Sequence, residues 1–312
     1  MLKSFLNIVN FKKFKKLGIH GIVVSAVLVF SLFLIILYNS EVGLSNEIGI
    51  QEPTFSNTDF SAVPQAVMAD AGKIADELIG NDEVNHQRVV SELMNSYIAA
   101  SNADIVIFFN SGGMGWNYIS NTPGWEAILN GITSELIDLG HHPLILNYCR
   151  TSRTFWGNIK EFIEASTRYP RKVNGMEKHV EFLVDNLPNL KFIIAGESTG
   201  SVITEQTMGY FRDNPNVYSI QTGCPFWYKT TPQPRTLRLS SNGYGVDTFS
   251  YGNIPSMIWS TAKSWFGLSS PEENAGNVLK SLRAPGHDYN WTYDSINFGI
   301  TEFLDDNFPK ES

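Results

Sequence analysis

Short apolar runs alternate with segments of helical periodicity along this chain, and that alternation constrains the fold more than any other feature. The clearest run is Ile-Val-Ile-Phe-Phe, within a strand expected over Asp104–Asn110. A continuous apolar run of this length is typical of a strand buried on both faces of a parallel sheet. Further strands are expected at Pro143–Tyr148, Lys191–Ala195, Val217–Thr222, Thr236–Ser240 and Val278–Arg283.

Helices are predicted around these strands, where apolar positions recur at spacings of three and four. They cover Thr122–Leu139, Val173–Asn186, Ser201–Phe211 and Asp294–Asn307. The alternation predicts an α/β fold with a mostly parallel central sheet of about six strands, flanked by helices and joined by right-handed crossovers. Two more helices, Ala62–Ile79 and Glu83–Ala100, form an N-terminal helical extension over residues 59–103.

The first 38 residues are typical of a membrane anchor. Residues 1–16 hold five lysines and no acid, and an uncharged apolar run follows over residues 17–38. About 20 apolar residues cross a bilayer, whereas a cleaved signal peptide has an apolar stretch of about 7 to 15 residues and a small-residue cleavage site. We therefore expect a basic cytoplasmic tail (1–16) and a single transmembrane signal-anchor helix (17–38). A polar linker (39–58) and an extracytoplasmic domain (59–312) complete the chain, since lysines mark the cytoplasmic side.

The charge beyond this tail excludes one class of partner. Five of the 23 basic residues lie in the tail, which leaves 18 basic against 31 acidic residues and a net charge of −13. Nucleic acid is not an expected partner, because phosphate binding needs clustered positive charge. The two cysteines, Cys149 and Cys224, and the pair His141–His142 show no spacing typical of a metal site. We expect no metal and no cofactor.

A serine stands between two glycines directly after one predicted strand and before a helix. A sharp strand-to-helix turn needs small neighbours, and the helix behind it directs N–H groups at the serine. At these residues the chain resembles the α/β-hydrolase superfamily, whose nucleophile elbow is G-x-S-x-G, and the resemblance covers about residues 104–308. It implies that Ser198 is the nucleophile and that Gly196, Glu197 and Gly200 form the elbow.

The order of the remaining residues suits a serine, acid, histidine triad, the order found in this superfamily. A serine needs a base, and His287 is the only histidine after Ser198. No acid occurs over residues 214–246, and the next one, Asp247, follows the strand after which the superfamily places its acid. Asp247 is therefore the expected orienting acid. The alternatives are Glu272 and Glu273.

A glycine-rich loop after the first parallel strand, Asn110–Trp116, is expected to complete an oxyanion hole, because glycines let backbone N–H groups approach closely. By the resemblance, the donors are the N–H of Thr199 and that of Gly113 or Met114. A phosphate-binding loop is the alternative, but no Gly-Lys-Ser/Thr follows. The S-x-x-K pattern over 260–263 stands in the wrong order relative to the other β-lactamase motifs.

Aromatic residues cluster in predicted loops near this site and favour an apolar pocket for a small or lipid-like acyl substrate. They are Trp116, Phe155, Trp156, Phe226, Trp227, Tyr228, Trp259, Trp265, Phe266 and Trp291. The segment Pro225–Arg235 is too short for a helical cap, so a fairly open site is expected. Together these features predict a membrane-anchored serine hydrolase acting on carboxylic esters through an acyl-enzyme. Amide, thioester or transferase chemistry, and a non-catalytic binding or structural protein with the same fold, remain as alternatives.

Overall fold

The structure is a computed structural model that describes residues 49–50, 59–80, 82–151, 155–279 and 282–310. All of them belong to one compact unit, Ser45–Ser312. The predicted cytoplasmic tail (1–16), transmembrane helix (17–38) and most of the linker (39–58) lie outside the described residues. Among the helices that are described, none combines the length and apolar character needed to cross a bilayer.

The central sheet has the order β1-β3-β2-β4-β5-β6. Five of its strands run parallel, as the sequence predicted: β2 (Ile105–Asn110), β3 (Pro143–Cys149), β4 (Lys191–Glu197), β5 (Val217–Thr222) and β6 (Thr236–Leu239). The sixth strand is β1 (Gly49–Ile50), which pairs antiparallel with β3. It lies within the predicted linker, where two residues are too few to show a strand period.

The prediction of a single strand at Val278–Arg283 was wrong. This stretch forms a separate antiparallel pair, β7 (Asn277–Leu279) and β8 (Leu282–Arg283), outside the main sheet. Val278 and Leu282 pack against a small apolar cluster of Phe249, Met257 and Ala284. The apolar residues of this segment therefore serve that cluster and not the core of the sheet.

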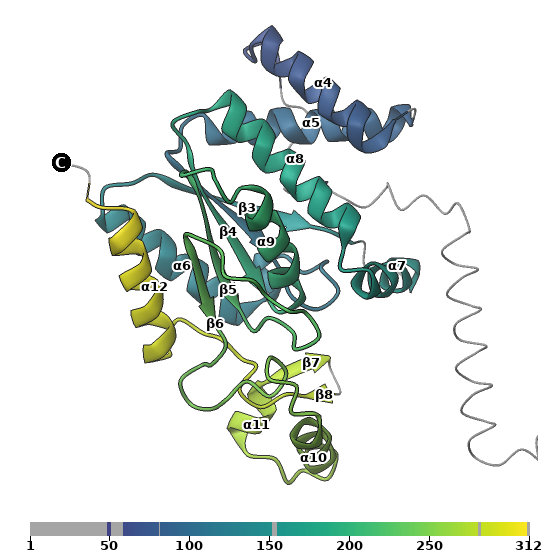
Figure 1. Cartoon of the computed structure of the whole chain (residues 1–312), viewed down its shortest axis with the longest axis vertical. Coiled ribbons are helices and arrows are strands. Elements are labelled where there is room, and N and C mark those ends of the chain that lie inside the picture. Colours follow the sequence, from purple (N-terminus) through teal and green to yellow (C-terminus); the bar gives the residue numbers. More distant parts are fainter. Residues whose placement is uncertain (1–48, 51–58, 81, 152–154, 280–281, 311–312) are drawn as a thin grey trace, which may run out of the picture. The chain divides into compact units, whose positions relative to one another are not determined.

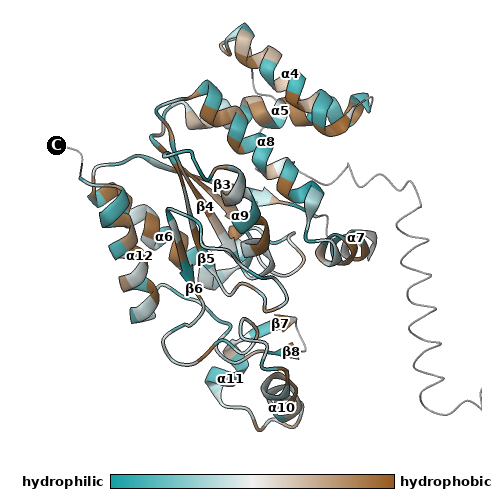
Figure 2. Ribbon diagram, viewed as in Figure 1, coloured by the Kyte–Doolittle hydropathy of each residue, from teal (hydrophilic) through white to brown (hydrophobic). Residues whose placement is uncertain are grey.

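Helices cover both faces of the sheet (Figure 1). On one face, α4 (Gln65–Ile79), α5 (Glu83–Ala100), α8 (Pro170–Asn186) and α9 (Thr199–Tyr210) enclose the first core. On the other face, α6 (Pro123–Asp138) and α12 (Asp294–Asn307) enclose the second core. Along β2, Val106 and Phe108 enter the first core, while Ile107 and Phe109 enter the second. Because β2 faces a core on each side, it is apolar throughout. The neighbouring strand β4 is likewise hydrophobic, as its colour in Figure 2 shows.

Three described α-helices escaped prediction: α7 (Phe155–Ser166), α10 (Ile254–Trp265) and α11 (Pro271–Ala275). The last two, with the β7–β8 hairpin, form an insertion between β6 and α12 (Figure 1). The segment Pro225–Arg235 itself contains no helix or strand. Additional structure near the carboxyl end of the sheet therefore comes from residues 241–283, a region in which the sequence predicted a strand but no helix.

Candidate active site

Ser198 occupies the tight turn between β4 and α9. Its φ is 50°, a positive value that costs strain in any residue other than glycine. A side chain at Gly200 would collide with the backbone carbonyl of Asn110, and one at Gly196 would lie 2.5 Å from the hydroxyl of Thr204. Both glycines are therefore required by close approach, and they hold the serine at the carboxyl end of the central strand.

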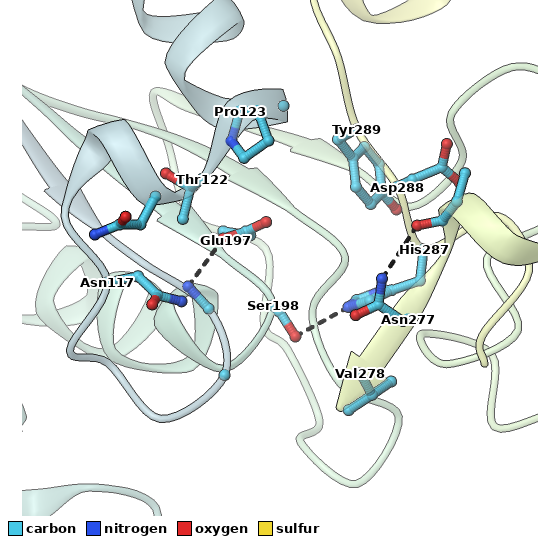
Figure 3. Close-up of a pocket in the computed structure, with 15 residues that line it drawn as sticks. Asn117, Thr122, Pro123, Glu197, Ser198, Asn277, Val278, His287, Asp288 and Tyr289 are labelled. Atoms are coloured by element: carbon cyan, nitrogen blue, oxygen red, sulfur yellow. Dashed lines mark hydrogen bonds between the residues drawn. The ribbon is translucent and has the colours of Figure 1, made fainter. Parts of the chain in front are cut away.

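Three predicted residues meet in a hydrogen-bonded chain, of which Figure 3 shows the contact between Ser198 and His287. The imidazole Nε2 of His287 lies 3.0 Å from Oγ of Ser198, and its Nδ1 lies 2.8 Å from Oδ2 of Asp247. Ser198 and the Asp247 carboxylate are 5% and 0% exposed, so the chain is shielded from solvent. An imidazole bonded on both nitrogens in this way can accept a proton from the serine while the acid fixes its tautomer.

Asp247 is held in its charged form by the groups around it. Burial alone would raise the pKa of this carboxyl, but hydrogen bonds from His287 and from the backbone and hydroxyl of Ser250 outweigh that effect, and the pKa is lowered. The backbone N–H of Phe249 and the hydroxyl of Tyr289 also donate to the carboxylate. A buried acid that stays ionised stabilises the positive charge that His287 acquires when it takes up a proton.

The alternative acids lie elsewhere. Glu273 forms an ion pair with Lys263, and Glu272 is exposed at the start of α11. Asp288, the neighbour of His287, accepts hydrogen bonds from Asn242 and Tyr293. Among these carboxylates, Asp247 is the one that contacts the imidazole.

The glycine-rich loop lies against the nucleophile. Gly112 and Gly113 line the same cavity as Ser198, whereas Met114 does not. The carbonyl of Gly113 accepts a hydrogen bond from the hydroxyl of Thr199, the first residue of α9, at 2.7 Å. Loop and helix are therefore joined at the place where the sequence predicted the two halves of an oxyanion hole. The N–H of Gly112 donates to Oε2 of Glu197 at 3.0 Å.

Arg150, at the end of β3, escaped prediction although it binds much of this arrangement together. Its side chain is fully buried and donates to the carboxylate of Glu161 on α7 at 2.7 Å. Its two terminal nitrogens donate to the side chains of Asn110 and Thr199, both at 2.8 Å. They also donate to the carbonyl oxygens of Ser111 and Gly113. One guanidinium thus joins the glycine-rich loop to the nucleophile helix.

A cavity of about 360 Å³ opens at Ser198 and His287. Its side chains are mostly polar and include Asn117, Asn121, Thr122, Glu197, Asn277 and Asp288. None of the suggested aromatic residues whose side chains the structure describes lines it, and the side chains of Phe155 and Trp156 lie outside that description. Trp259, Trp265 and Phe266 are instead 66%, 72% and 78% exposed on and beside α10. The expectation of an apolar pocket next to the serine was wrong for the described side chains, because a cluster of aromatic residues in the sequence does not decide which way their side chains face.

Two further patterns from the sequence find other partners. Lys263, of the S-x-x-K pattern, pairs with Glu273. The Nδ1 atom of His141 lies 2.8 Å from Oδ2 of Asp104. Within the described ranges, His, Cys, Asp and Glu form no group of three or more suited to a metal ion.

No protein-family model matches the chain, and no curated protein matches it either. Comparison with solved structures finds a cutinase of Trichoderma reesei in complex with a C11Y4 phosphonate inhibitor. That enzyme is 13% identical, and the similarity covers 62% of this chain and 88% of the cutinase with a TM-score of 0.33.

Proposed function

We propose that this protein is a serine hydrolase that cleaves carboxylic esters, held at a membrane by its N-terminal apolar segment with the catalytic domain outside. The observation that carries the proposal is the chain from Ser198 through His287 to Asp247, with contacts of 3.0 and 2.8 Å. A serine hydroxyl becomes a useful nucleophile only when a base can take its proton, and this chain supplies the base and its orienting acid.

In the first half of the reaction, Oγ of Ser198 bonds to the ester carbonyl carbon as its proton passes to Nε2 of His287. The carbonyl oxygen becomes an oxyanion, which the N–H groups of Thr199 and of Gly113 or Met114 stabilise. The C–O bond to the alcohol then breaks, and the alcohol leaves with the proton from His287. An acyl group remains on Ser198.

In the second half, water gives a proton to His287 and adds to the acyl carbon. Collapse of the second tetrahedral intermediate breaks the bond to Oγ, releases the acid and returns the proton to Ser198. Asp247 holds the imidazole in one tautomer throughout. Arg150 acts as a positioning residue, because it holds the carbonyl oxygens of the glycine-rich loop while the loop N–H groups serve the oxyanion.

Hydrolysis of p-nitrophenyl acetate by the full chain tests the proposal. The Ser198→Ala variant should lose at least about 10³-fold in kcat, since removal of a serine nucleophile leaves only residual catalysis by binding and the oxyanion hole. Ser134→Ala, at an exposed serine on α6, should hydrolyse the ester like the wild type. Equal activity of all three proteins would contradict the proposal and favour a non-catalytic role. Matched amide and thioester substrates then decide the type of acyl bond.

A further inference from the structure

The cavity at Ser198 has two polar walls. One wall comes from the segment after β2 and includes the amides of Asn117 and Asn121 and the hydroxyl of Thr122. The other comes from the insertion and the segment that follows it, with Asn277 and Asp288. Figure 3 shows Asn117, Thr122 and Glu197 on one side of the serine hydroxyl and Asn277 and Asp288 on the other. A substrate bound to Ser198 would therefore contact hydrogen-bonding groups on both sides.

Several of these groups remain available for a substrate. Within the described part of the chain, the half-buried amide of Asn117 and the exposed amide of Asn121 form no hydrogen bond with another residue. Glu197 uses Oε2 to accept the N–H of Gly112, which leaves Oε1 for another donor. Amides donate and accept, so they complement groups that also do both, and hydroxyl groups have this property.

Apolar surface in the cavity is small. Val278, Pro123 and Ala275 are its aliphatic members, and Tyr289 is its one aromatic ring other than the imidazole. The hydroxyl of Tyr289 already donates to Asp247. A long acyl chain placed here would cover unpaired amides and gain little apolar contact, and an unpaired buried polar group costs binding energy.

The charged groups in the cavity further restrict the kind of substrate that can bind. No lysine or arginine lines the cavity, whereas two carboxylates do, so an anionic substrate would be repelled. A cationic group is also a poor match, because both oxygens of Asp288 already accept hydrogen bonds, from Asn242 and Tyr293. Burial raises the pKa of Glu197. The shift makes this carboxyl easier to protonate, and a protonated carboxyl can donate as well as accept.

From this lining we infer that the substrate is an ester of an uncharged polyhydroxylated alcohol, with the hydroxyl groups bound by Asn117, Glu197 and Asn277. This inference rests on the proposed function. It goes beyond it by naming the class of alcohol. Sites built to hydrogen-bond a substrate hydroxyl reject the analogue that lacks it more strongly than apolar sites reject a missing methylene.

Two acetates with the same ring size test the inference on the full chain: an inositol monoacetate and cyclohexyl acetate. The wild type should show a kcat/KM at least about tenfold higher for the inositol ester, since each well-formed neutral hydrogen bond contributes severalfold to about tenfold. Asn117→Leu should lower this ratio about tenfold. Asn130→Leu, at an exposed asparagine of α6, should leave the ratio unchanged.

Labelling by a fluorophosphonate probe separates the two ideas. A labelled wild type that prefers cyclohexyl acetate, cleaves neither acetate, or prefers the acetate of a quaternary amino alcohol overturns the substrate inference while the proposed function stands. The same holds if Asn117→Leu and Asn130→Leu change the ratio equally. A wild type that is neither labelled nor active on p-nitrophenyl acetate overturns the proposed function, and the substrate inference with it.

Discussion

Ser198 and His287 meet across two parts of the molecule that are stabilised in different ways. The nucleophile half consists of the β4–α9 turn, the loop 111–115 and Arg150. It lies between the two large cores of the sheet and is bound together by a fully buried guanidinium. The histidine half, residues 241–288, has a small cluster in which Phe249, Met257 and Ala284 are the buried apolar residues. The nucleophile is thus supported by the two large cores of the sheet, whereas the segment that carries its base, His287, has only a small apolar cluster.

The difference is visible on the surface as well. On helix α10, in the histidine half, the exposed fractions of Ile258, Trp259 and Trp265 are 62%, 66% and 72%. Regions with few buried apolar contacts open at a lower free energy than the global core. The two halves should therefore respond differently to mutation, and the predictions below test this contrast.

The largest effect on activity is expected at the contact between the imidazole of His287 and the carboxylate of Asp247. Asp247→Asn should lower kcat by about 10⁴-fold, because an amide stabilises the wrong tautomer of His287, the size of effect known for this change in a serine protease. Glu272→Gln should have no such effect. Steady-state hydrolysis of p-nitrophenyl acetate measures both variants, and the reverse ranking would show that the acid has been assigned wrongly.

In the nucleophile half, Arg150→Met should lower stability and activity together. It removes the cation that pairs with the buried carboxylate of Glu161, and breaking a buried ion pair costs about 3 to 5 kcal/mol. It also frees the loop carbonyls, so kcat should fall about 10²-fold with little change in KM, similar to the loss of an oxyanion donor. Urea unfolding and kinetics on the folded fraction separate the two effects.

The control for Arg150 is Arg238→Met. Arg238 pairs with the buried Glu205, and its hydrogen bonds go to Glu205, Gln221 and Thr231, not to the glycine-rich loop. Its loss should cost stability and leave kcat near the wild-type value. If both variants lower kcat equally, Arg150 has no positioning role.

In the histidine half, Phe249→Ala should remove the ring whose centroid lies 4.8 Å from that of the His287 imidazole. The free energy of local unfolding in this half should fall by about 3 kcal/mol. Hydrogen exchange should accelerate over residues 247–288 while β2 and β4 keep their protection. Phe192→Ala, in the first core of the sheet, should instead lower the free energy of global unfolding. Equal changes everywhere would mean that the two halves unfold as one unit.

A smaller effect is expected from Glu197. Burial raises its pKa above the ordinary value of 4.5, so the native state holds this proton more tightly than the unfolded chain does. Wild-type stability should therefore fall as pH rises from about 4.5 through the raised pKa, by the linkage of proton binding to folding. Glu197→Gln should remove this loss. Unfolding in urea at pH 4 and pH 7.5 tests the sign, and a wild type that gains stability relative to the variant at pH 7.5 would contradict it.

The smallest effect concerns the exposed face of α10. Trp259→Ser and Trp265→Ser should change kcat/KM for a water-soluble ester by less than about threefold, because exposed substitutions away from a site change energies by about 0.5 kcal/mol. A large loss of kcat/KM in either variant would mean that α10 contributes to the site.

Periodicity predicted the five parallel strands and most helices because their apolar residues repeat over several turns or fill whole strands. It missed β1, since two residues carry no period, and α11, which has five residues. It also missed α7 and α10, although each has 12 residues. It misjudged Val278–Arg283 because an apolar run does not reveal which core it joins. Local pattern therefore predicted most of the long elements, while the shortest ones depend on tertiary contacts.

The positions of Ser198, Asp247 and His287 were predictable from their order along the chain, and the structure brings them together. Arg150 was not predictable, because a lone arginine after a strand resembles any surface cation. Its role depends on carbonyl groups contributed by a loop almost 40 residues away in sequence. The polar cavity was missed for a similar reason, since Asn117 and Asn277 belong to distant segments of the chain.

Peptide mass spectrometry of the full chain after treatment with a fluorophosphonate examines the activated serine itself. We expect a single phosphonyl adduct on the peptide that contains Ser198, formed at least about 10³-fold more slowly in His287→Ala, because the serine then lacks its base. An adduct on another residue, or none on the folded wild type, would contradict the assignment of Ser198 as an activated nucleophile.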